Sequence, residues 1–477
     1  QMNLFKDMVC YQEEVRDPSR IAEVLNRVIE KAIRGSAPAQ INVPRDYWTQ
    51  VVDIELPPIV RLERQAGGAT AIEEAAKLLS NAKFPVILSG AGVVIGGAIE
   101  DCVKLAEKLD SPVCSGYQHN DSFPGSHPLA VGPLGYNGSK AAMELIAKAD
   151  VVLALGTRLN PFSTLPGYGI DYWPKNAKII QVDMNSDRIG LTKKVTVGIC
   201  GDAKLVAQQI LGKLSPKAGD TDRQKRKDLI HQTKSAWLQK LSSLDHEDDD
   251  PGTVWNKEAR DRDKDRMSPR QAWRAIQAGM PEDVIISSDI GNNCAIGNAY
   301  PTFEKGRKYL APGLFGPCGY GFPSILGAKI GCPDTPVIGF AGDGAFGISM
   351  NEMSSCAREE WPAISMVIFR NYQWGAEKRN TTLWFDNNFI GTELDPELSY
   401  AKVANACGLK GVTVKTMEET TKAIKQSCED QKKGITTFIE VILNQELGEP
   451  FRRDAMKKPV KVAGIKKEDM RPQKGLN

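Results

Sequence analysis

The segment VIGFAGDGAFGISMNEMSSCAREEWPAISMVIFRNYQWG, residues 337–375, guides the interpretation of the rest of this 477-residue chain. It begins with an apolar run, turns sharply through Gly-Asp-Gly at 342–344, and continues as an amphipathic stretch. A second apolar run, 364–369, leads into Asn371. This order of patterns predicts a strand, a glycine-rich turn, a helix, a strand and a loop, which together form a βαβ unit. Both loops then fall at the carboxyl ends of parallel strands, where open α/β sheets bind ligands.

The residue types in these two loops suit a metal-bound diphosphate. Glycines on both sides of Asp343 allow backbone N–H groups to approach phosphate oxygens, and the following helix directs its N-terminus toward them. The Asp343 carboxylate and the Asn371 amide are hard oxygen ligands, which magnesium combines with phosphate oxygens and water. A lone Gly-Asp-Gly is more often an ordinary tight turn, so the prediction depends on the added strand, helix and second-loop Asn.

Length and composition restrict the class of protein. A chain of 477 residues exceeds one compact core, so two or three domains are expected. The formal net charge of +2 gives no sign of a nucleic-acid partner. The longest apolar run, 84–99, is interrupted by glycines and is too short to cross a membrane. Ten scattered cysteines without a C-x-x-C pair indicate neither a disulfide framework nor a zinc site, which fits a cytoplasmic protein.

The spacing of about thirty residues between Gly-Asp-Gly and Asn371 resembles the thiamin-diphosphate motif of the acetolactate synthase and pyruvate decarboxylase superfamily. The Asn-Asn pair of that motif is Arg370-Asn371 in this chain. The resemblance implies thiamin diphosphate and magnesium as cofactors, with the metal held by Asp343, Asn371 and the backbone carbonyl of Gln373. The cofactor-binding residues that it implies in this segment are Gly342, Asp343, Gly344, Ala345 and Asn371.

Two further segments resemble cofactor loops of the same superfamily. The loop after the predicted strand 284–287 places Asn292 and Asn293 where diphosphate contacts are made, and two adjacent amides can donate N–H to phosphate oxygens. In segment 314–323, the Gly316 carbonyl and the Cys318 N–H would contact the aminopyrimidine ring. Cys318 stands where the superfamily usually has a bulky apolar residue, and we expect it to serve packing rather than thiol chemistry.

The resemblance implies the α/β fold class, with the three-domain thiamin-diphosphate-enzyme architecture of doubly wound parallel sheets and an incomplete first domain. The superfamily's activating glutamate would lie upstream of Gln1, so we expect an N-terminally truncated fragment and assign no catalytic residue. The expected domains are a remnant of the pyrimidine-binding domain (1–55), a linker (56–68), a central Rossmann-like domain (69–212), a charged linker (213–265), a diphosphate-binding domain (266–446) and a C-terminal tail (447–477).

In the central domain, apolar patterns predict strands over 85–89 and 151–155 and a helix over 99–109. A second glycine-rich loop, Gly-Ala-Gly at 90–92, follows the first of these strands. Its spacing is GxGxxxG rather than the GxGxxG of dinucleotide sites, and such loops also serve plain strand-to-helix packing. FAD is therefore possible in this domain but is not expected to be required. An oxidoreductase built on this loop would lack a convincing partner motif.

Three segments resemble the sulfoacetaldehyde acetyltransferase family within the superfamily: FRNYQWGAEKRN (369–380), Pro-Cys-Gly-Tyr (317–320) and the tail PFRRDAMKKPV (450–460). This resemblance implies conversion of sulfoacetaldehyde and phosphate to acetyl phosphate and sulfite. Both substrates are anions, so basic side chains near the cofactor are candidates to bind them, although a solvated basic helix surface explains them as well. These candidates are Arg370, Lys378 and Arg379.

Two alternatives stay open at this point. One is an acetolactate-synthase-like carboligase acting on pyruvate, and the other is a fragment that binds the cofactor without turning over. The resemblance also implies small anionic substrates as the partners, a homodimer or homotetramer, and neither a nucleic acid nor a membrane.

Overall fold

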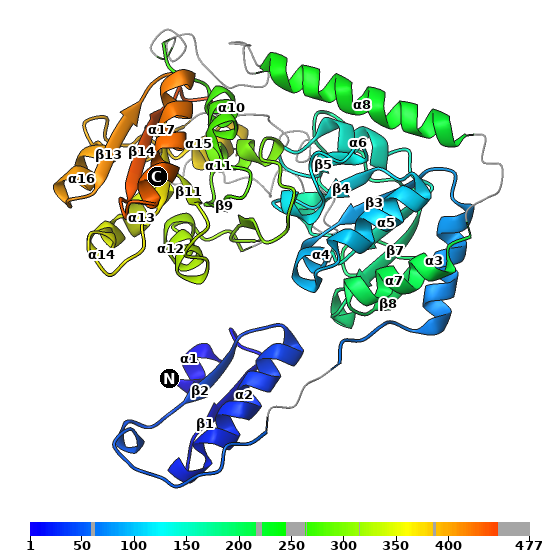
Figure 1. The fold of residues 1–477 in the computed structure, drawn as a ribbon, viewed down its shortest axis with the longest axis horizontal. Coiled ribbons are helices and arrows are strands. Elements are labelled where there is room, and N and C mark those ends of the chain that lie inside the picture. The colour runs from blue at the N-terminus through cyan, green and yellow to red at the C-terminus, as the bar shows by residue number, and fades with distance from the viewer. Residues whose placement is uncertain are drawn as a thin grey trace.

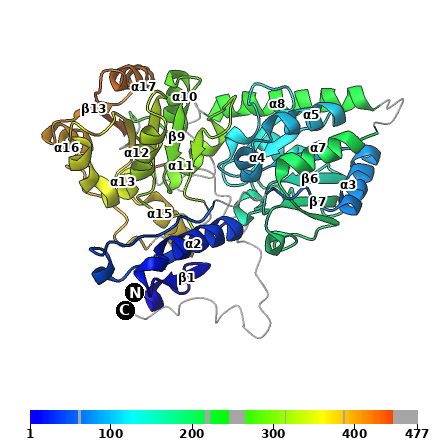
Figure 2. The same ribbon diagram turned by 60° about the horizontal axis from the view of Figure 1, so that its bottom comes forward.

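The computed structural model describes residues 1–58, 63–215, 222–244, 263, 265–313, 315–384 and 388–446. These residues form two six-stranded sheets and one two-stranded sheet, and every pair of neighbouring strands runs parallel. The predicted α/β class with parallel sheets is confirmed. Figures 1 and 2 show the two six-stranded domains side by side, each with helices on both faces of its sheet.

The N-terminal unit is small. One amphipathic helix, α2, packs on a two-stranded parallel sheet, and the buried cluster between them comprises Val15, Val24 and Val28. Apolar residues at helical spacing over 21–32 and the segment AQINVP at 39–44 predict the helix and the second strand, but YQEE has no apolar run that would predict the first strand. The elements are α1 (Met2–Phe5), β1 (Tyr11–Glu14), η1 (Pro18–Arg20), α2 (Ile21–Gly35), β2 (Ala39–Asn42) and η2 (Arg45–Tyr47).

The central domain has the strand order β5-β4-β3-β6-β7-β8. Its middle strands, PVILS and VVLAL, are buried at every residue because helices cover both faces of a parallel sheet. The predicted strands 85–89 and 151–155 and the predicted helix 99–109 match the structure. Its elements are α3 (Ala69–Asn81), β3 (Pro85–Ser89), α4 (Ala91–Gly96), α5 (Ile99–Leu109), β4 (Val113–Ser115), η3 (Asn120–Ser122), β5 (Ala130–Pro133), α6 (Lys140–Ile146), β6 (Val151–Leu155), η4 (Pro161–Ser163), β7 (Lys178–Asp183), η5 (Ser186–Arg188), β8 (Val197–Cys200) and α7 (Ala203–Lys213).

Helix α8 (Arg223–Leu244) lies in the charge-dense region, where the sequence predicts a linker with a helical piece. The helix runs along the central domain in both views (Figures 1 and 2). Its side chain Ile230 belongs to the hydrophobic core of the central domain, whereas Trp237 and Leu241 belong to the core of the C-terminal domain. The described part of this region therefore packs against both domains, while residues 245–262 lie outside the description.

The C-terminal domain has the strand order β10-β9-β11-β12-β14-β13. Strand β11 lies between β9 and β12, so these three strands end at the same edge of the sheet. Its elements are α10 (Pro269–Gly279), β9 (Ile285–Ser288), α11 (Asn292–Ile296), η6 (Gly297–Ala299), β10 (Tyr309–Leu310), α12 (Gly321–Gly331), β11 (Val337–Gly342), α13 (Asp343–Ser349), η7 (Met350–Glu352), α14 (Met353–Cys356), β12 (Ser365–Arg370), α15 (Gly375–Trp384), α16 (Tyr400–Ala406), β13 (Lys410–Val414), α17 (Met417–Gln431) and β14 (Thr437–Ile442).

Polar contacts join the two six-stranded domains. The Asn120 amide donates to the backbone carbonyls of Asn298 (2.8 Å) and Pro301 (2.9 Å). The buried Asp121 carboxylate accepts the backbone N–H groups of Lys308 (2.9 Å) and Tyr309 (3.2 Å). These bonds satisfy buried polar groups of both domains and fix the position of one domain against the other. No helix among the described residues is long and apolar enough to span a membrane.

Candidate functional site

Three loops meet where β9, β11 and β12 end, at the edge that the βαβ pattern predicts. The first loop leads into α11, the second is the Gly-Asp-Gly turn, and the third leads into α15. The ring of Trp374 packs against the turn: its nearest atom would lie 2.8 Å from a Cβ placed on Gly344. Asn292 lies against the start of α15, where a Cβ on Gly375 would be 3.5 Å from its amide nitrogen. Segments about 80 residues apart in the chain are thereby brought together, as Brändén's rule predicts.

Asp343 is the first residue of α13 and is 1% exposed. Its Oδ1 accepts the backbone N–H of Gly344 at 3.0 Å, and its Oδ2 accepts the backbone N–H of Tyr372 at 2.7 Å. Oδ2 also accepts the Arg370 guanidinium at 3.0 Å. Burial raises the pKa of Asp343 to about 6, although the Arg370 charge and the backbone donors oppose this rise. The carboxylate is therefore held at a fixed place in the second loop.

The third loop supplies the other predicted metal ligands. Asn371 is 2% exposed, and within the described part of the chain no hydrogen bond engages its amide group. The following residue, Tyr372, has a left-handed backbone with φ of 62°, which is uncommon for a tyrosine and is typical of ligand-binding turns. Gln373 is 3% exposed, and its buried side-chain Oε1 has no hydrogen-bond partner among the residues that the structure describes. The loop thus presents oxygen atoms that the described residues do not engage.

The first loop carries the predicted diphosphate contacts. Asn292 and Asn293 begin α11 and are both buried. The Tyr136 hydroxyl of the central domain donates to Asn292 Oδ1 at 3.2 Å, which directs the amide nitrogen toward Gly375. The Oδ1 atom of Asn293 is buried and accepts no hydrogen bond from the described part of the chain. A buried polar atom without a partner is rare and calls for a bound group or water.

The segment around Cys318 lies beside these loops. Asp289 holds it by accepting the backbone N–H groups of Gly319 (3.1 Å) and Gly321 (2.7 Å). Gly316 has φ of 64°, which only a glycine adopts readily. Cys318 is exposed, and partial burial together with the nearby Asp289 and Glu377 carboxylates raises the pKa of its thiol. A raised pKa favours the neutral thiol and does not support a nucleophilic role.

The predicted substrate residues have different surroundings. Arg370 is the last residue of β12 and is 0% exposed, with its guanidinium turned to Asp343, so it is not placed to meet a diffusing substrate. Lys378, on α15, forms an ion pair with Glu393 and a 3.4 Å hydrogen bond with Gln445. Arg379 belongs to the same helix, but its side chain lies outside the described residues.

The structure places three further residues at these loops that the sequence did not identify. Asp289 positions the Cys318 segment, Tyr136 orients Asn292, and Trp374 covers the Gly-Asp-Gly turn. Asp289 could have been identified from the sequence, since a carboxylate directly after a buried strand lies at the ligand-binding edge of the sheet. Tyr136 carried no signal, because its partner is 156 positions away in another domain.

Comparisons with known proteins agree with this geometry. Residues 72–210 match the central domain of thiamine pyrophosphate enzymes, and residues 289–441 match their C-terminal TPP-binding domain. The chain is 78% identical over 476 residues to a probable sulfoacetaldehyde acetyltransferase of Rhizobium meliloti, and the match covers 100% of this chain and 80% of the relative. It is 73% identical to a sulfoacetaldehyde acetyltransferase of Roseovarius nubinhibens, covering 99% of this chain and 78% of the relative.

The chain belongs to the sulfoacetaldehyde acetyltransferase family of thiamine pyrophosphate enzymes. Two solved structures share the fold of this family member at low identity. Benzoylformate decarboxylase of Polynucleobacter necessarius has a TM-score of 0.73 and 19% identity, covering 94% of this chain and 78% of that one. A thiamine diphosphate-dependent 4-hydroxybenzoylformate decarboxylase of Rhodococcus jostii has a TM-score of 0.70 and 22% identity, covering 93% and 77%. The predicted thiamin-diphosphate-enzyme architecture is confirmed.

The residues at the site fit the cofactor of this family. A Cβ placed on Gly342 would meet no atom within 4 Å, so this end of the turn faces open space where a phosphate can approach the backbone. Among the described residues the Asn371 amide has no hydrogen-bond partner, and the Asp343 carboxylate is fixed, which together give the hard oxygen ligands that magnesium prefers. The Asn293 oxygen, which no described residue engages, lies in the neighbouring loop.

Proposed function

We propose that this protein converts sulfoacetaldehyde and inorganic phosphate to acetyl phosphate and sulfite, with thiamin diphosphate and magnesium as cofactors. The observation that carries the proposal is the match to sulfoacetaldehyde acetyltransferases at 78%, 73% and 68% identity over nearly the whole chain. The acetolactate synthases among its relatives are more distant, at 29% identity or below. The reaction balances without an oxidant or reductant, since the carbon–sulfur bond breaks and the acetyl group passes to phosphate.

We assign the cofactor-holding roles by position in the three loops. Asp343, Asn371 and the backbone carbonyl of Gln373 would hold magnesium, because they supply oxygen ligands on adjacent loops. Bound thiamin diphosphate supplies the carbon nucleophile and the electron sink for acyl transfer, while the protein supplies binding and orientation. The remaining cofactor-binding residues in this proposal are Asn292, Asn293, Gly316, Cys318, Gly342, Gly344 and Ala345.

The substrate-binding residues are a narrower proposal. The charge of Lys378 is paired with Glu393, and Arg370 is buried. Of the three predicted basic residues, Arg379 is the one whose assignment to substrate binding these contacts do not affect. We also propose the homodimer or homotetramer that the family resemblance implies, together with the domain boundaries predicted from the sequence. The family-model matches at 72–210 and 289–441 fall within the predicted central and diphosphate-binding domains. The ten free cysteines are in keeping with a reducing cytoplasm.

The test is a product assay with purified protein. Sulfoacetaldehyde, phosphate, thiamin diphosphate and magnesium are supplied, and both sulfite and acetyl phosphate are measured. We expect the two products in equal amounts, with formation dependent on phosphate and on magnesium. Acetolactate formed from pyruvate, without sulfite release from sulfoacetaldehyde, would contradict the proposal and favour the carboligase alternative.

A parallel assay with the Rhizobium meliloti relative is the matched comparison, because this chain covers 80% of that relative. We expect both proteins to form the same two products. If both bind thiamin diphosphate but neither releases sulfite, the cofactor assignment stands and the substrate assignment fails.

A further inference from the structure

Arg370 occupies the place of the first Asn in the superfamily's Asn-Asn pair, and its surroundings differ from those of a substrate-binding arginine. It ends β12 in the middle of the sheet, where its backbone pairs with Ile442 of β14 and its carbonyl accepts the Leu443 N–H at 2.9 Å. The side chain is 1% exposed. The guanidinium therefore starts from a rigid element and points into the protein, which is a position suited to holding other groups in place.

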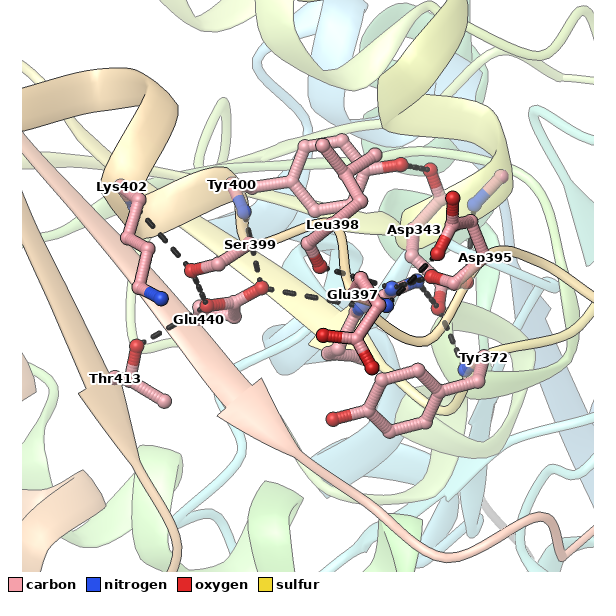
Figure 3. A network of polar contacts seen from close by, with 12 residues as sticks. Asp343, Tyr372, Asp395, Glu397, Leu398, Ser399, Tyr400, Lys402, Thr413 and Glu440 are labelled. Atoms are coloured by element: carbon pink, nitrogen blue, oxygen red, sulfur yellow. Dashed lines mark hydrogen bonds and ion pairs between the residues drawn. The ribbon is translucent and has the colours of Figure 1, made fainter. Parts of the chain in front are cut away.

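The guanidinium is shared among several buried groups. One terminal nitrogen donates to Asp343 Oδ2 at 3.0 Å, and the other donates to the backbone carbonyls of Asp395 and Leu398, the latter at 3.0 Å. The ring of Tyr372 lies 4.1 Å from the guanidinium carbon and that of Tyr400 lies 5.5 Å away. Figure 3 shows these partners converging from three separate segments. A planar group with several fixed donors can join them, and an asparagine at this place is too short to do so.

A second buried carboxylate completes the network. Glu440 of β14 lies 3.9 Å from the Nε of Arg370 and is 2% exposed. It accepts the Ser399 hydroxyl at 2.7 Å and the Tyr400 N–H at 3.0 Å, which fixes the start of α16. The Tyr400 hydroxyl in turn donates to the backbone carbonyl of Asp343 at 2.9 Å. Two carboxylates around one guanidinium leave a net negative charge, which suits a cation at the Asp343 end.

We propose that Arg370 is a positioning residue that fixes the Asp343 carboxylate for magnesium and ties it to segment 395–398. The inference deepens the proposed function, because it depends on Asp343 being a metal ligand. Arg370 and the Tyr372 N–H occupy Oδ2, so the carboxylate cannot rotate, and Oδ1 keeps only its bond with the Gly344 N–H. Groups that orient a metal ligand in this way affect metal affinity without touching the metal.

The experiment compares Arg370→Lys and Arg370→Met with Arg226→Met as the matched control. Arg226 is also buried and also donates to backbone carbonyls, those of Lys83 (3.0 Å), Leu109 (3.3 Å) and Asp110 (3.2 Å), but it lies on α8 far from the three loops in sequence. Quenching of tryptophan fluorescence by thiamin diphosphate is titrated against magnesium, since Trp374 lies over Gly344. Manganese binding is measured by electron paramagnetic resonance, and the apoprotein melting temperature by circular dichroism.

We expect Arg370→Met to raise the half-saturating magnesium concentration by about 10- to 100-fold, the usual range for loss of a group that orients a metal ligand. Arg370→Lys keeps the positive charge but loses the paired donors of the guanidinium, so we expect an intermediate rise in the half-saturating magnesium concentration. Arg226→Met should lower the melting temperature and leave the magnesium requirement within about twofold of wild type. Arg370→Lys stays informative if the methionine variant does not fold.

Two outcomes would overturn the inference. The first is an Arg370 variant that melts earlier, as Arg226→Met does, but has the wild-type magnesium requirement, because Arg370 would then be a structural residue only. The second is tighter metal binding after loss of the arginine, which would mean that its charge competes with the cation. Wild-type protein without magnesium-dependent cofactor binding would overturn the proposed function as well, so the two failures are distinguishable.

Discussion

The two six-stranded domains each contain a glycine-rich turn between a buried strand and a helix, and the two turns are used differently. In the central domain, the N–H groups of Gly90 and Gly92 donate to the carbonyls of Leu155 and Gly156, at 3.1 Å and 2.8 Å. A Cβ on Gly92 would lie 2.7 Å from the Gly156 Cα. In the C-terminal domain, a Cβ on Gly342 would meet nothing within 4 Å. The first turn is filled by protein at both glycines, whereas the second is covered by Trp374 at Gly344 and open at Gly342.

The comparison shows what glycine contributes in each case. At 90–92, small residues allow two backbone segments to cross closely, which is a packing role. At 342–344, the first glycine leaves the backbone accessible, and Asp343 between the glycines adds a buried carboxylate held by two N–H groups. The weak GxGxxxG pattern therefore corresponds to packing in this structure, and the Gly-Asp-Gly pattern to a ligand-binding geometry.

The largest expected effect tests the carboxylate that distinguishes the second turn. Asp343→Asn keeps the size of the side chain but removes its charge, so magnesium-dependent binding of thiamin diphosphate should weaken by at least about 100-fold, the upper range for disturbing a metal ligand's surroundings. Asp202→Asn is the control, because Asp202 is also buried but caps α7 in the central domain. Calorimetric titration of cofactor with magnesium measures both. Unchanged affinity in Asp343→Asn would refute the ligand assignment.

The next effect tests packing in the first turn. Gly92→Ala places a methyl group against the backbone of Gly156, so the free energy of unfolding should fall by about 1–3 kcal/mol. Urea unfolding of the apoprotein measures the change, and cofactor affinity of the folded protein should stay at the wild-type value. Gly212→Ala, in the open helix surface of α7, is the control and should be neutral or stabilising. A large loss of cofactor binding in Gly92→Ala would indicate a ligand at this turn.

The counterpart in the second turn should show the reverse pattern. Gly342 has φ of −69° and ψ of 158°, which any residue adopts, and its Cβ position is free. Gly342→Ala should therefore change the free energy of unfolding by less than about 0.5 kcal/mol. Cofactor affinity should fall by about tenfold, or 1.4 kcal/mol, because the methyl group obstructs the approach of phosphate to the backbone. Wild-type affinity in this variant would place the diphosphate elsewhere.

The smallest effect concerns Lys378, whose charge is paired with the half-exposed Glu393. Because Glu393 already neutralises this charge, Lys378→Met should raise the KM for phosphate or sulfoacetaldehyde by less than about fivefold, which corresponds to about 1 kcal/mol. Initial-rate kinetics with each substrate varied in turn provides the measurement. A rise of KM far beyond that range would mean that Lys378 leaves Glu393 and binds the substrate directly.

Continuous apolar runs and clear apolar stripes identified several elements. Strands 85–89 and 151–155 are continuous apolar runs, and the helix 99–109 has a clear apolar stripe, so each was predicted within a residue of its observed bounds. β1 and β13 were not predicted, because YQEE and KGVTV lie at sheet edges and carry no such run. The buried strand β14 was not predicted either, and Glu440 interrupts its apolar run.

Residue types and spacing alone determined the βαβ unit at 337–375, the carboxylate and amide at the ends of its strands, and the resemblance to thiamin-diphosphate enzymes. Tertiary structure decided which partner each charged side chain meets. Arg370 was a candidate for the substrate and lies instead against Asp343, and Lys378 lies against Glu393. Spacing along a chain fixes which residues share an edge of a sheet, whereas the partner of a long flexible side chain depends on loops that the fold brings from elsewhere.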